Sequence, residues 1–212
     1  MIGKSTQGTA NRRKPKARSY YIIGCGSAEK RANWEVENLD VLRAGAGALY
    51  PPEGRRGFPV YRETPRVVIG KRRSAYPPRD VEPFHSYWLI SDRLKVLFES
   101  IDPHVFAFQA CDVKLSDGSM GPVYWLCDVV RVLDAFVQGT LEDMRTYRER
   151  TGLIYRGFLG DKTLVFNEAI VGDSQIFRTP YSFNDVFCDQ SLKDACKHAG
   201  IEGMRFSACF RK

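Results

Sequence analysis

The chain of 212 residues carries 32 basic and 25 acidic side chains, for a formal net charge of +7, and 43% of its residues are hydrophobic. This size and composition suffice to bury an ordinary core in one large or two small domains. No uncharged apolar run approaches the roughly 20 residues of a membrane-spanning helix, and the N-terminus is polar and basic where a secretory signal is apolar. These features exclude a membrane-spanning protein and predict a soluble globular protein of the cytoplasm.

The positive charge is concentrated in two segments. Residues 1–18 hold six basic residues and no acidic one, residues 53–79 hold eight basic and two acidic residues, and the other 18 basic and 23 acidic residues give −5. Because residues 1–18 lack apolar anchors, we expect a disordered basic arm. Such an arm is more often a solvated tail than a segment that binds nucleic acid specifically. The net charge alone therefore does not indicate a nucleic-acid-binding protein.

Ordered structure is expected after the arm. Residues 19–24 (SYYIIG) predict a strand, and residues 34–42 (WEVENLDVL) predict a second element of undetermined type. Seven of the eleven prolines then fall in residues 51–83, which excludes a long helix or an interior strand because proline lacks an amide proton. We predict that this Pro-rich segment, residues 51–83, is ordered but irregular, with short edge strands at residues 59–61 and 67–69.

One later segment shows the periodicity of an amphipathic helix. Its apolar residues recur at the spacing of one helix face, namely Ile90, Leu94, Leu97, Phe98 and Ile101. Ser91 is suited to cap the first turn through its hydroxyl, and Asp92 complements the positive end of the helix dipole. Asp102 and Pro103 end the helix. We therefore predict a buried amphipathic helix over residues 91–100.

Apolar runs separated by turn signals follow this helix. They predict strands at residues 105–108, 123–132, 153–158, 163–170 and 175–178. Since little room is left for crossover helices, antiparallel pairing is favoured. Thr140 and Asp143 form a capping-box pattern for a short helix through Arg150, whereas a final helix is capped by Asp189 and ends at Gly200.

The order of these elements predicts an α+β fold, with a mainly antiparallel sheet, a few short helices and a preceding basic arm. We expect the disordered arm at residues 1–18 and a Pro- and Arg-rich N-terminal portion at residues 19–83, packed on the core. The core itself is expected at residues 84–212.

A glycine pair follows the first predicted strand. Gly24 and Gly26 match the start of a dinucleotide-binding turn, but Glu29 stands where the third glycine is needed, and its carboxylate would lie near the pyrophosphate. Gly45 and Gly47 likewise do not complete the glycine pattern of a dinucleotide-binding turn. We therefore expect no cofactor.

The six cysteines are scattered, form no Cys-x-x-Cys motif and stand mostly beside apolar residues, which predicts reduced thiols in the core. A cysteine nucleophile needs a neighbouring histidine. Cys196 and His198 lie two residues apart on the final predicted helix, so their side chains point to different faces. The three histidines show no metal-ligand spacing. The sequence thus predicts neither a catalytic nor a metal-binding residue.

Short motifs in the second half of the chain are similar to those of a known family. They comprise Ser91, Asp92, Arg93 and Leu94, then Asp134, then Ile176, Phe177 and Arg178, and finally Leu192, Gly203 and Phe206. Over roughly residues 85–210, this pattern resembles immunity family 11 of bacterial polymorphic toxin systems, a former domain of unknown function. The resemblance implies a non-enzymatic protein that binds a cognate toxin domain and occludes its active site or substrate access.

A protein of that kind acts through exposed side chains at an interface. The residues expected to bind the partner are Arg55, Arg56, Arg72 and Arg73 of the Pro-rich segment, all expected to be exposed, together with His85 and His104. Arg178 is expected to be a buried structural arginine, and Trp88 and Trp125 are expected in the core. The resemblance implies a protein partner, with no membrane involved and nucleic acid disfavoured, and leaves the oligomeric state open.

Two other classes of protein stay open. A nucleic-acid-associated protein would use the basic arm and residues 53–79. An enzyme would need acid–base groups such as Asp112, Asp128 and Asp134, which alternate along strand-like segments. The neighbouring reading frame discriminates among these classes, because a large secreted protein with a C-terminal toxin domain would indicate immunity.

Overall fold

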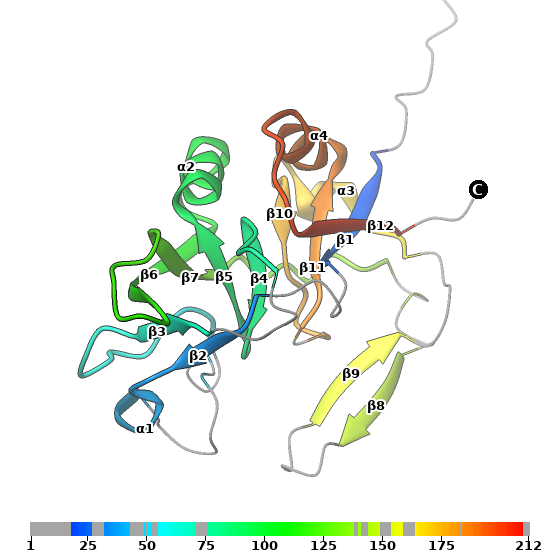
Figure 1. Cartoon of the computed structure of the whole chain (residues 1–212). Coiled ribbons are helices and arrows are strands. Elements are labelled where there is room, and N and C mark those ends of the chain that lie inside the picture. Colours follow the sequence, from blue (N-terminus) through cyan, green and yellow to red (C-terminus); the bar gives the residue numbers. More distant parts are fainter. Residues whose placement is uncertain are drawn as a thin grey trace, which may run out of the picture.

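The described part of the chain forms a six-stranded sheet, a four-stranded sheet and a separate two-stranded hairpin, and the two longest helices stand at the top of the two larger sheets (Figure 1). The structure is a computed structural model, and it describes residues 18–26, 32–42, 49, 51, 55–70, 76–137, 140, 144–148, 154–158, 164–182 and 184–209. For residues 144–148 and 154–158 only the backbone is described. Most elements are strands in mainly antiparallel sheets, and the prediction of an α+β fold is confirmed.

The larger sheet has six strands in the order β2-β3-β6-β7-β5-β4. Its strands are β2 (Trp34–Val36), β3 (Arg66–Ile69), β4 (Val81–Phe84), β5 (Tyr87–Ser91), β6 (Phe106–Leu115) and β7 (Tyr124–Val129). All neighbours are antiparallel except β3 and β6, which are parallel. The short helix α1 (Leu39–Leu42) follows β2.

Two predictions for the Pro-rich segment need correction. Residues 67–69 were expected in an edge strand, but β3 lies between β2 and β6. This position is tolerated because Pro65 precedes the strand, so that residues 66–69 keep their amide protons. The strand expected at residues 59–61 is not formed. Tyr61 and Phe58 instead pack their rings against the sheet, with Phe58 and Tyr87 centroids 4.6 Å apart.

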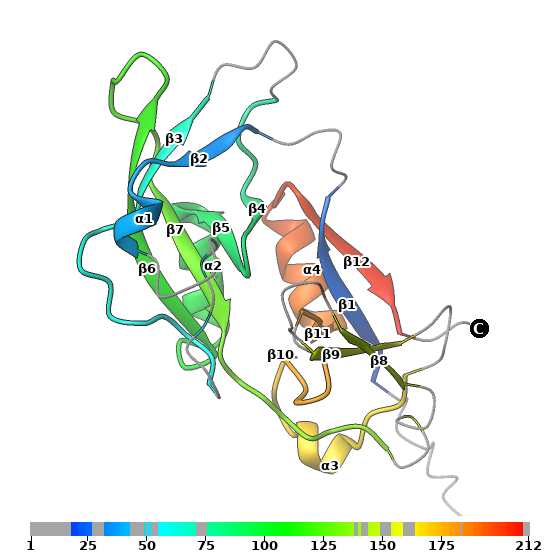
Figure 2. The same ribbon diagram turned by 90° about the horizontal axis from the view of Figure 1, so that it is seen from below.

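The second sheet has four strands in the order β10-β11-β1-β12. Its strands are β1 (Tyr20–Cys25), β10 (Ile176–Phe177), β11 (Val186–Asp189) and β12 (Met204–Ala208). β1, which confirms the strand predicted at the start of the ordered chain, pairs with β11 on one side and β12 on the other. Seen from below, β1 also stands next to β4 of the larger sheet (Figure 2). The N-terminal portion therefore contributes strands to both sheets.

Two further segments differ from their predicted structure. The helix expected from Thr140 through Arg150 is instead strand β8 (Met144–Arg148), which forms an antiparallel hairpin with β9 (Ile154–Phe158). Both strands contain tyrosine, and residues of this class favour extended backbone over helix. The strand expected at residues 163–170 is wrong for the described residues 164–170, which hold an isolated bridge at Phe166 followed by helix α3 (Glu168–Val171). The side chain of Asn167 caps this helix by accepting a hydrogen bond from the amide of Ala169 at 3.0 Å.

Both long helices confirm the sequence prediction. Helix α2 (Asp92–Ile101) is capped by Ser91, whose hydroxyl accepts a hydrogen bond from the amide of Leu94 at 3.3 Å. Helix α4 (Gln190–His198) is capped by Asp189, and Gly200 adopts a φ of +62° just after its end. No helix in the described ranges has the length and apolar character needed to cross a bilayer.

The hydrophobic core consists of three clusters. The first lies beneath α2 and α4 and includes Leu94 and Phe98, the second gathers the aromatic rings behind the four-stranded sheet, and the third lies between the six-stranded sheet and the Pro-rich segment. Four of the six cysteines are buried and all six are free thiols, as the sequence predicted. Trp88 and Trp125, expected in the core, are only partly buried at its border.

Arg18 corrects the predicted boundary of the basic arm. Residues 1–17 lie outside the described residues, whereas the Arg18 guanidinium makes a 2.8 Å ion pair with Asp189 and donates to the carbonyl oxygen of Ser174 at 2.8 Å. Asp189 caps α4 and is almost fully buried. Its carboxylate is therefore a partner that holds Arg18 within the fold.

Candidate functional site

Asp128 on β7 joins the Pro-rich segment to the core. Its carboxylate is fully buried, pairs with Arg56, and accepts hydrogen bonds from the amide of Gly57 at 2.8 Å and from Nη2 of Arg178 at 3.3 Å. The expectation that Arg56 is exposed is wrong, since a buried carboxylate requires a cation and Arg56 supplies one. Tyr87 strengthens the junction by donating a hydrogen bond to the carbonyl of Gly57 at 3.1 Å.

Arg178 is the buried structural arginine that the sequence predicted. Its Nε donates to the carbonyl of Val129 at 3.0 Å, which ties the end of β10 to the end of β7. Burial, followed by the nearby Arg56, lowers the pKa of Arg178 to about 10. At neutral pH Arg178 is therefore still charged, and Asp128 is the carboxylate that it shares with Arg56.

The other residues expected to bind a partner lie apart from this buried group. Arg55 is exposed, and Arg72 and Arg73 lie outside the described residues. His85 is exposed in the turn before β5, with a φ of +55°, and His104 is exposed before β6. Because β5 and β6 both run antiparallel to β7, these two histidines lie at the same end of the six-stranded sheet.

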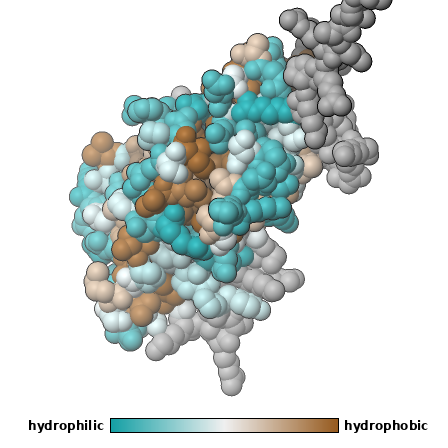
Figure 3. Space-filling view, turned by 90° about the horizontal axis from the view of Figure 1, so that it is seen from above, coloured by the Kyte–Doolittle hydropathy of each residue, from teal (hydrophilic) through white to brown (hydrophobic). Residues whose placement is uncertain are grey.

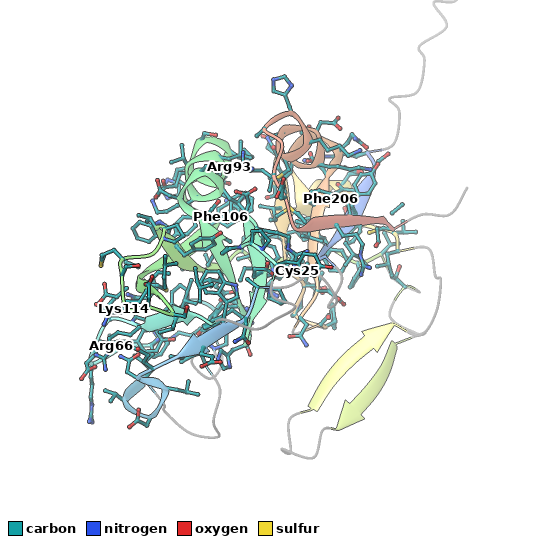
Figure 4. All side chains as sticks on the ribbon, in the orientation of Figure 1. Cys25, Arg66, Arg93, Phe106, Lys114 and Phe206 are labelled. Atoms are coloured by element: carbon teal, nitrogen blue, oxygen red, sulfur yellow. The ribbon has the colours of Figure 1, made fainter. Side chains whose placement is uncertain are left out.

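Asp80 connects α2 to the end of α4. Its carboxylate accepts hydrogen bonds from the Ser91 hydroxyl at 2.7 Å, from Nε of Arg93 at 2.6 Å and from the amide of Glu202 at 2.8 Å. Arg93, which lies between the two helices in Figure 4, also donates to the carbonyl of Gly200 at 2.9 Å. Ser91 and Arg93, two of the family-like residues, thus hold the two helices together.

This network predicts an acid-sensitive contribution to stability. Burial alone would raise the pKa of Asp80, but hydrogen bonds from Arg93, Glu202 and Ser91 outweigh it and hold the pKa below its ordinary value. Such a carboxyl stabilises the fold above its unfolded pKa of about 3.9, and the contribution is lost as the pH falls below that value. We expect Asp80→Asn to lower the free energy of unfolding at pH 7 and to reduce its decline in acid, measured by urea unfolding. Asp173→Asn, an exposed control, should change neither, and an unaltered acid decline in Asp80→Asn would contradict the assignment.

The remaining family-like residues also have structural positions. Phe177 is fully buried and Phe206 packs against the first core cluster, whereas Asp134 is exposed. Gly203 has a φ of +87°, and a Cβ there would lie 2.4 Å from the carbonyl oxygen of Val81. This glycine is required because the backbones of β4 and the loop before β12 meet at that point.

The glycine pair lies at the end of β1, with Gly24 inside the strand and Gly26 just after it. The amide of Gly26 donates a hydrogen bond to the carbonyl of Gly203 at 2.6 Å. A Cβ on Gly26 would lie 2.6 Å from Nη1 of Arg79, whose guanidinium pairs with Glu82. The close approach of Arg79 therefore accounts for Gly26 in structural terms.

The described thiols are unsuited to nucleophilic chemistry. Burial raises the pKa of Cys111, Cys196 and Cys209 to about 12, so little thiolate forms at neutral pH. His198 is exposed at the end of α4, while Cys196 is buried. Among the described residues, no group of three His, Cys, Asp or Glu side chains could hold a metal ion.

The face of the six-stranded sheet that carries Phe106, called the outer face below, is only partly covered by a helix. Helix α2 packs on β5 and β7, and Phe98 stacks on Phe106 of β6 with ring centroids 4.3 Å apart. Further along β6, the side chains that point the same way as Phe106 are Ala110, Asp112 and Lys114. Ala110 and Asp112 are exposed, so α2 does not cover this half of the strand.

Neighbouring strands extend this uncovered surface. Cross-strand partners point to the same side of a sheet, and the partners of Ala110 and Lys114 are Trp125, Val68 and Met120. Val123 precedes Trp125 by two residues and shares its side by alternation. We call this surface the open face; it comprises Val68, Ala110, Asp112, Lys114, Met120, Val123 and Trp125. Figure 4 shows Lys114 and Arg66 near one another at this side of the molecule.

The tryptophan of the open face is held in place from α2. Nε1 of Trp125 donates a hydrogen bond to Asp92 at 3.0 Å, and Nζ of Lys95 lies 4.7 Å from the ring centroid. Met120 is 81% exposed and Val123 is 60% exposed. Seen from above, apolar side chains form a broken band between hydrophilic ones (Figure 3). The open face therefore combines exposed apolar side chains, one oriented tryptophan and flanking charges.

Sequence reasoning missed the open face, although β6 carries a signal for it. The residues of β6 on this side change from Phe106 and Phe108 to Asp112 and Lys114 along one strand. An apolar-to-charged change on one side indicates that only half of that side is covered. Which half of the sheet α2 covers depends on strand order, which the local pattern does not encode.

A surface hollow lies at the other side of the same sheet. It has a volume of about 380 Å³ and is lined by Asp40, Val41, Leu42, Pro59, Val60, Tyr61 and Arg62. Val60 is fully exposed at its wall. The hollow joins α1 to the Pro-rich segment and is the second surface at which a partner side chain could be seated.

The open face combines exposed apolar side chains with flanking charges, as the surfaces of protein interfaces do. A model of the Immunity protein family (Imm11) matches residues 19–210. The chain therefore belongs to this immunity protein family and has an immunity function. The match confirms the resemblance found in residues 85–210 and extends it to the segment containing β1, β2 and β3. No curated protein matches the chain.

Proposed function

We propose that this chain is a non-enzymatic immunity protein of the cytoplasm that binds a cognate bacterial toxin domain and neutralises it by occluding its active site or substrate access. The observation that carries the proposal is the family match over residues 19–210. The exposed apolar side chains around Trp125 support it, because protein interfaces concentrate their binding energy in aromatic and apolar anchors with a polar rim.

Neutralisation by occlusion requires tight binding. A dissociation constant near 1 nM corresponds to about −12 kcal/mol, which an interface with a few desolvated anchors can supply. We expect co-expression of the chain with the toxin domain encoded beside it to restore growth. We also expect the two proteins to copurify at about 1 M salt, where exposed charges are screened over about 3 Å.

The control for this experiment is a toxin domain from an unrelated system, which should stay toxic in the presence of the chain. Loss of rescue with the cognate domain, together with no complex on copurification, would contradict the proposed function. Rescue without a complex would contradict occlusion alone and would indicate neutralisation by another route.

Three of the eight basic residues in residues 53–79 contribute little to the nucleic-acid alternative, because carboxylates of the fold pair with them. Arg56 pairs with Asp128, Arg66 with Glu63 at 2.7 Å, and Arg79 with Glu82 at 2.6 Å. These arginines are largely neutralised by carboxylates within the fold. A nucleic-acid binder would lose affinity steeply with added salt because its binding depends on counterion release. Salt-sensitive retention of nucleic acid without growth rescue would favour this alternative.

A further inference from the structure

We propose that the toxin domain docks on the open face, through an apolar side chain seated among Met120, Val123 and Trp125 and through a cation placed against Asp112. This inference rests on the proposed function and adds to it the surface and the chemistry of contact. The partner is a protein surface with an apolar anchor flanked by both charges, the cation facing Asp112 and an anion facing Lys114.

The parallel strand pair β3 and β6 is covered on one face and open on the other. On the inner face Val67 and Val113 are buried in the third core cluster. On the outer face Asp112 is exposed and Val68 only partly buried. A partner on the open face would give this strand pair the cover that it lacks on one side.

A second feature of the open face is its composition. Met120 and Val123 are among the most exposed large apolar side chains of the described residues, at 81% and 60% exposure. Val123 lies two residues from Trp125 and Met120 lies further along, opposite Lys114. Tryptophan is among the residues most enriched where side chains dominate binding energy. Three neighbouring strands, β3, β6 and β7, carry the surface, which makes it about 10 Å wide at the usual strand spacing. That width suits the central region of a protein interface.

The charges of the open face favour a protein as its partner. Among the described side chains, none pairs with the carboxylate of Asp112 or the ammonium of Lys114, which are two residues apart on β6. Arg66 lies opposite Asp112 across β3 and β6, but its guanidinium pairs with Glu63 at 2.7 Å. A surface with unpaired charges of both signs complements a protein, whose surface also carries both signs. It does not suit a nucleic acid or an anionic bilayer, because both require a cationic surface.

The open face is rigid. Most of its side chains stand on paired strands, and the Trp125 ring is held by Asp92 and Lys95 of α2. A preformed surface loses little side-chain freedom on binding, which favours affinity. The hollow at Val60 lacks such support, because its walls come from the four residues of α1 and from residues 59–62, which form no regular element.

The test uses the purified full chain and the toxin domain encoded beside it, with affinity measured by calorimetry and protection measured by growth rescue. Val123→Arg and Met120→Arg each place a charge where the apolar anchor would sit. We expect either change to weaken binding about 100-fold, the size of effect seen at dominant interface residues. Asp112→Lys should weaken binding about 10-fold, since it removes the carboxylate that faces a cation.

The matched control is Ile170→Arg, which makes the same kind of change at an exposed apolar residue on α3. It should alter the affinity less than twofold. Val60→Arg tests the hollow and should also bind as the wild type does. Thermal unfolding of each variant verifies that the fold is retained, and all four substituted apolar residues are exposed in the free chain.

The outcomes separate the inference from the function on which it rests. If the wild-type chain neither binds nor protects, the proposed function fails. If the wild type binds and Val123→Arg and Met120→Arg bind equally well, the open face is wrong while the function stands. Loss of binding in Val60→Arg alone would assign the contact to the hollow. Amide hydrogen exchange of the wild-type complex gives an independent readout, with protection expected at residues 110–125; protection confined to other segments would overturn the inference.

Discussion

Replacing Asp128 with alanine is expected to lower the free energy of unfolding by about 3–5 kcal/mol, the range observed when one partner of a buried ion pair is removed. Asp128 is fully buried and pairs with both Arg56 and Arg178, so that its removal takes a carboxylate away from two largely buried cations. Urea unfolding followed by circular dichroism measures the change. Asp134→Ala, which removes an exposed carboxylate a few residues away, should change stability by less than about 0.5 kcal/mol.

A second variant identifies the cause of the Asp128 effect. If the loss comes from uncompensated arginines, replacing Arg56 with methionine in the Asp128→Ala background should restore part of the stability, because one buried cation is removed. A loss under about 1 kcal/mol in Asp128→Ala would show that solvent reaches the ion pair. That result would also remove the main reason for the Pro-rich segment to dock where it does.

Leu94→Ala is expected to cost about 2–5 kcal/mol, through lost burial and the cavity left behind. Leu94 is fully buried on the core-facing side of α2, in the cluster that also contains Phe98. Val96→Ala on the exposed side of the same helix is the matched control and should cost less than about 0.5 kcal/mol. Leu97 is only partly buried, so Leu97→Ala should fall between the two. Equal costs for Leu94→Ala and Val96→Ala would mean that α2 buries a different face.

The sequence predicted elements whose signals are local. Helices α2 and α4 each begin at a side chain, Ser91 or Asp189, that caps the following turn through contacts within three residues. The apolar spacing of α2 correctly indicated that Leu94 and Phe98 face the core. The strand at the start of the ordered chain was predicted from its composition alone, since β1 is a nearly continuous run of aromatic and β-branched residues.

The failures involve contacts between distant parts of the chain. Arg56 was expected to be exposed because it lies among prolines and arginines, and its partner Asp128 lies 72 residues away. The helix predicted from Thr140 through Arg150 rested on a capping pattern that pairing between β8 and β9 overrides. The open face could not be predicted from the pattern either, because its residues meet only through the strand order of the six-stranded sheet.

The position of β1 constrains how this protein is assembled during synthesis. Tyr20 pairs with Asp189 and Tyr21 with Ala208, so an interior strand of the four-stranded sheet is made long before both of its neighbours. The strands of the six-stranded sheet all lie within residues 34–129, but the core beneath α2 is completed by Ile176, Val186 and Leu192. Until those residues are made, Tyr20 and Ile23 of β1 lack the core that buries them. A ribosome that stalls before β11 would therefore release a chain with an unpaired strand and an incomplete core, which is a substrate for proteases and prone to aggregation.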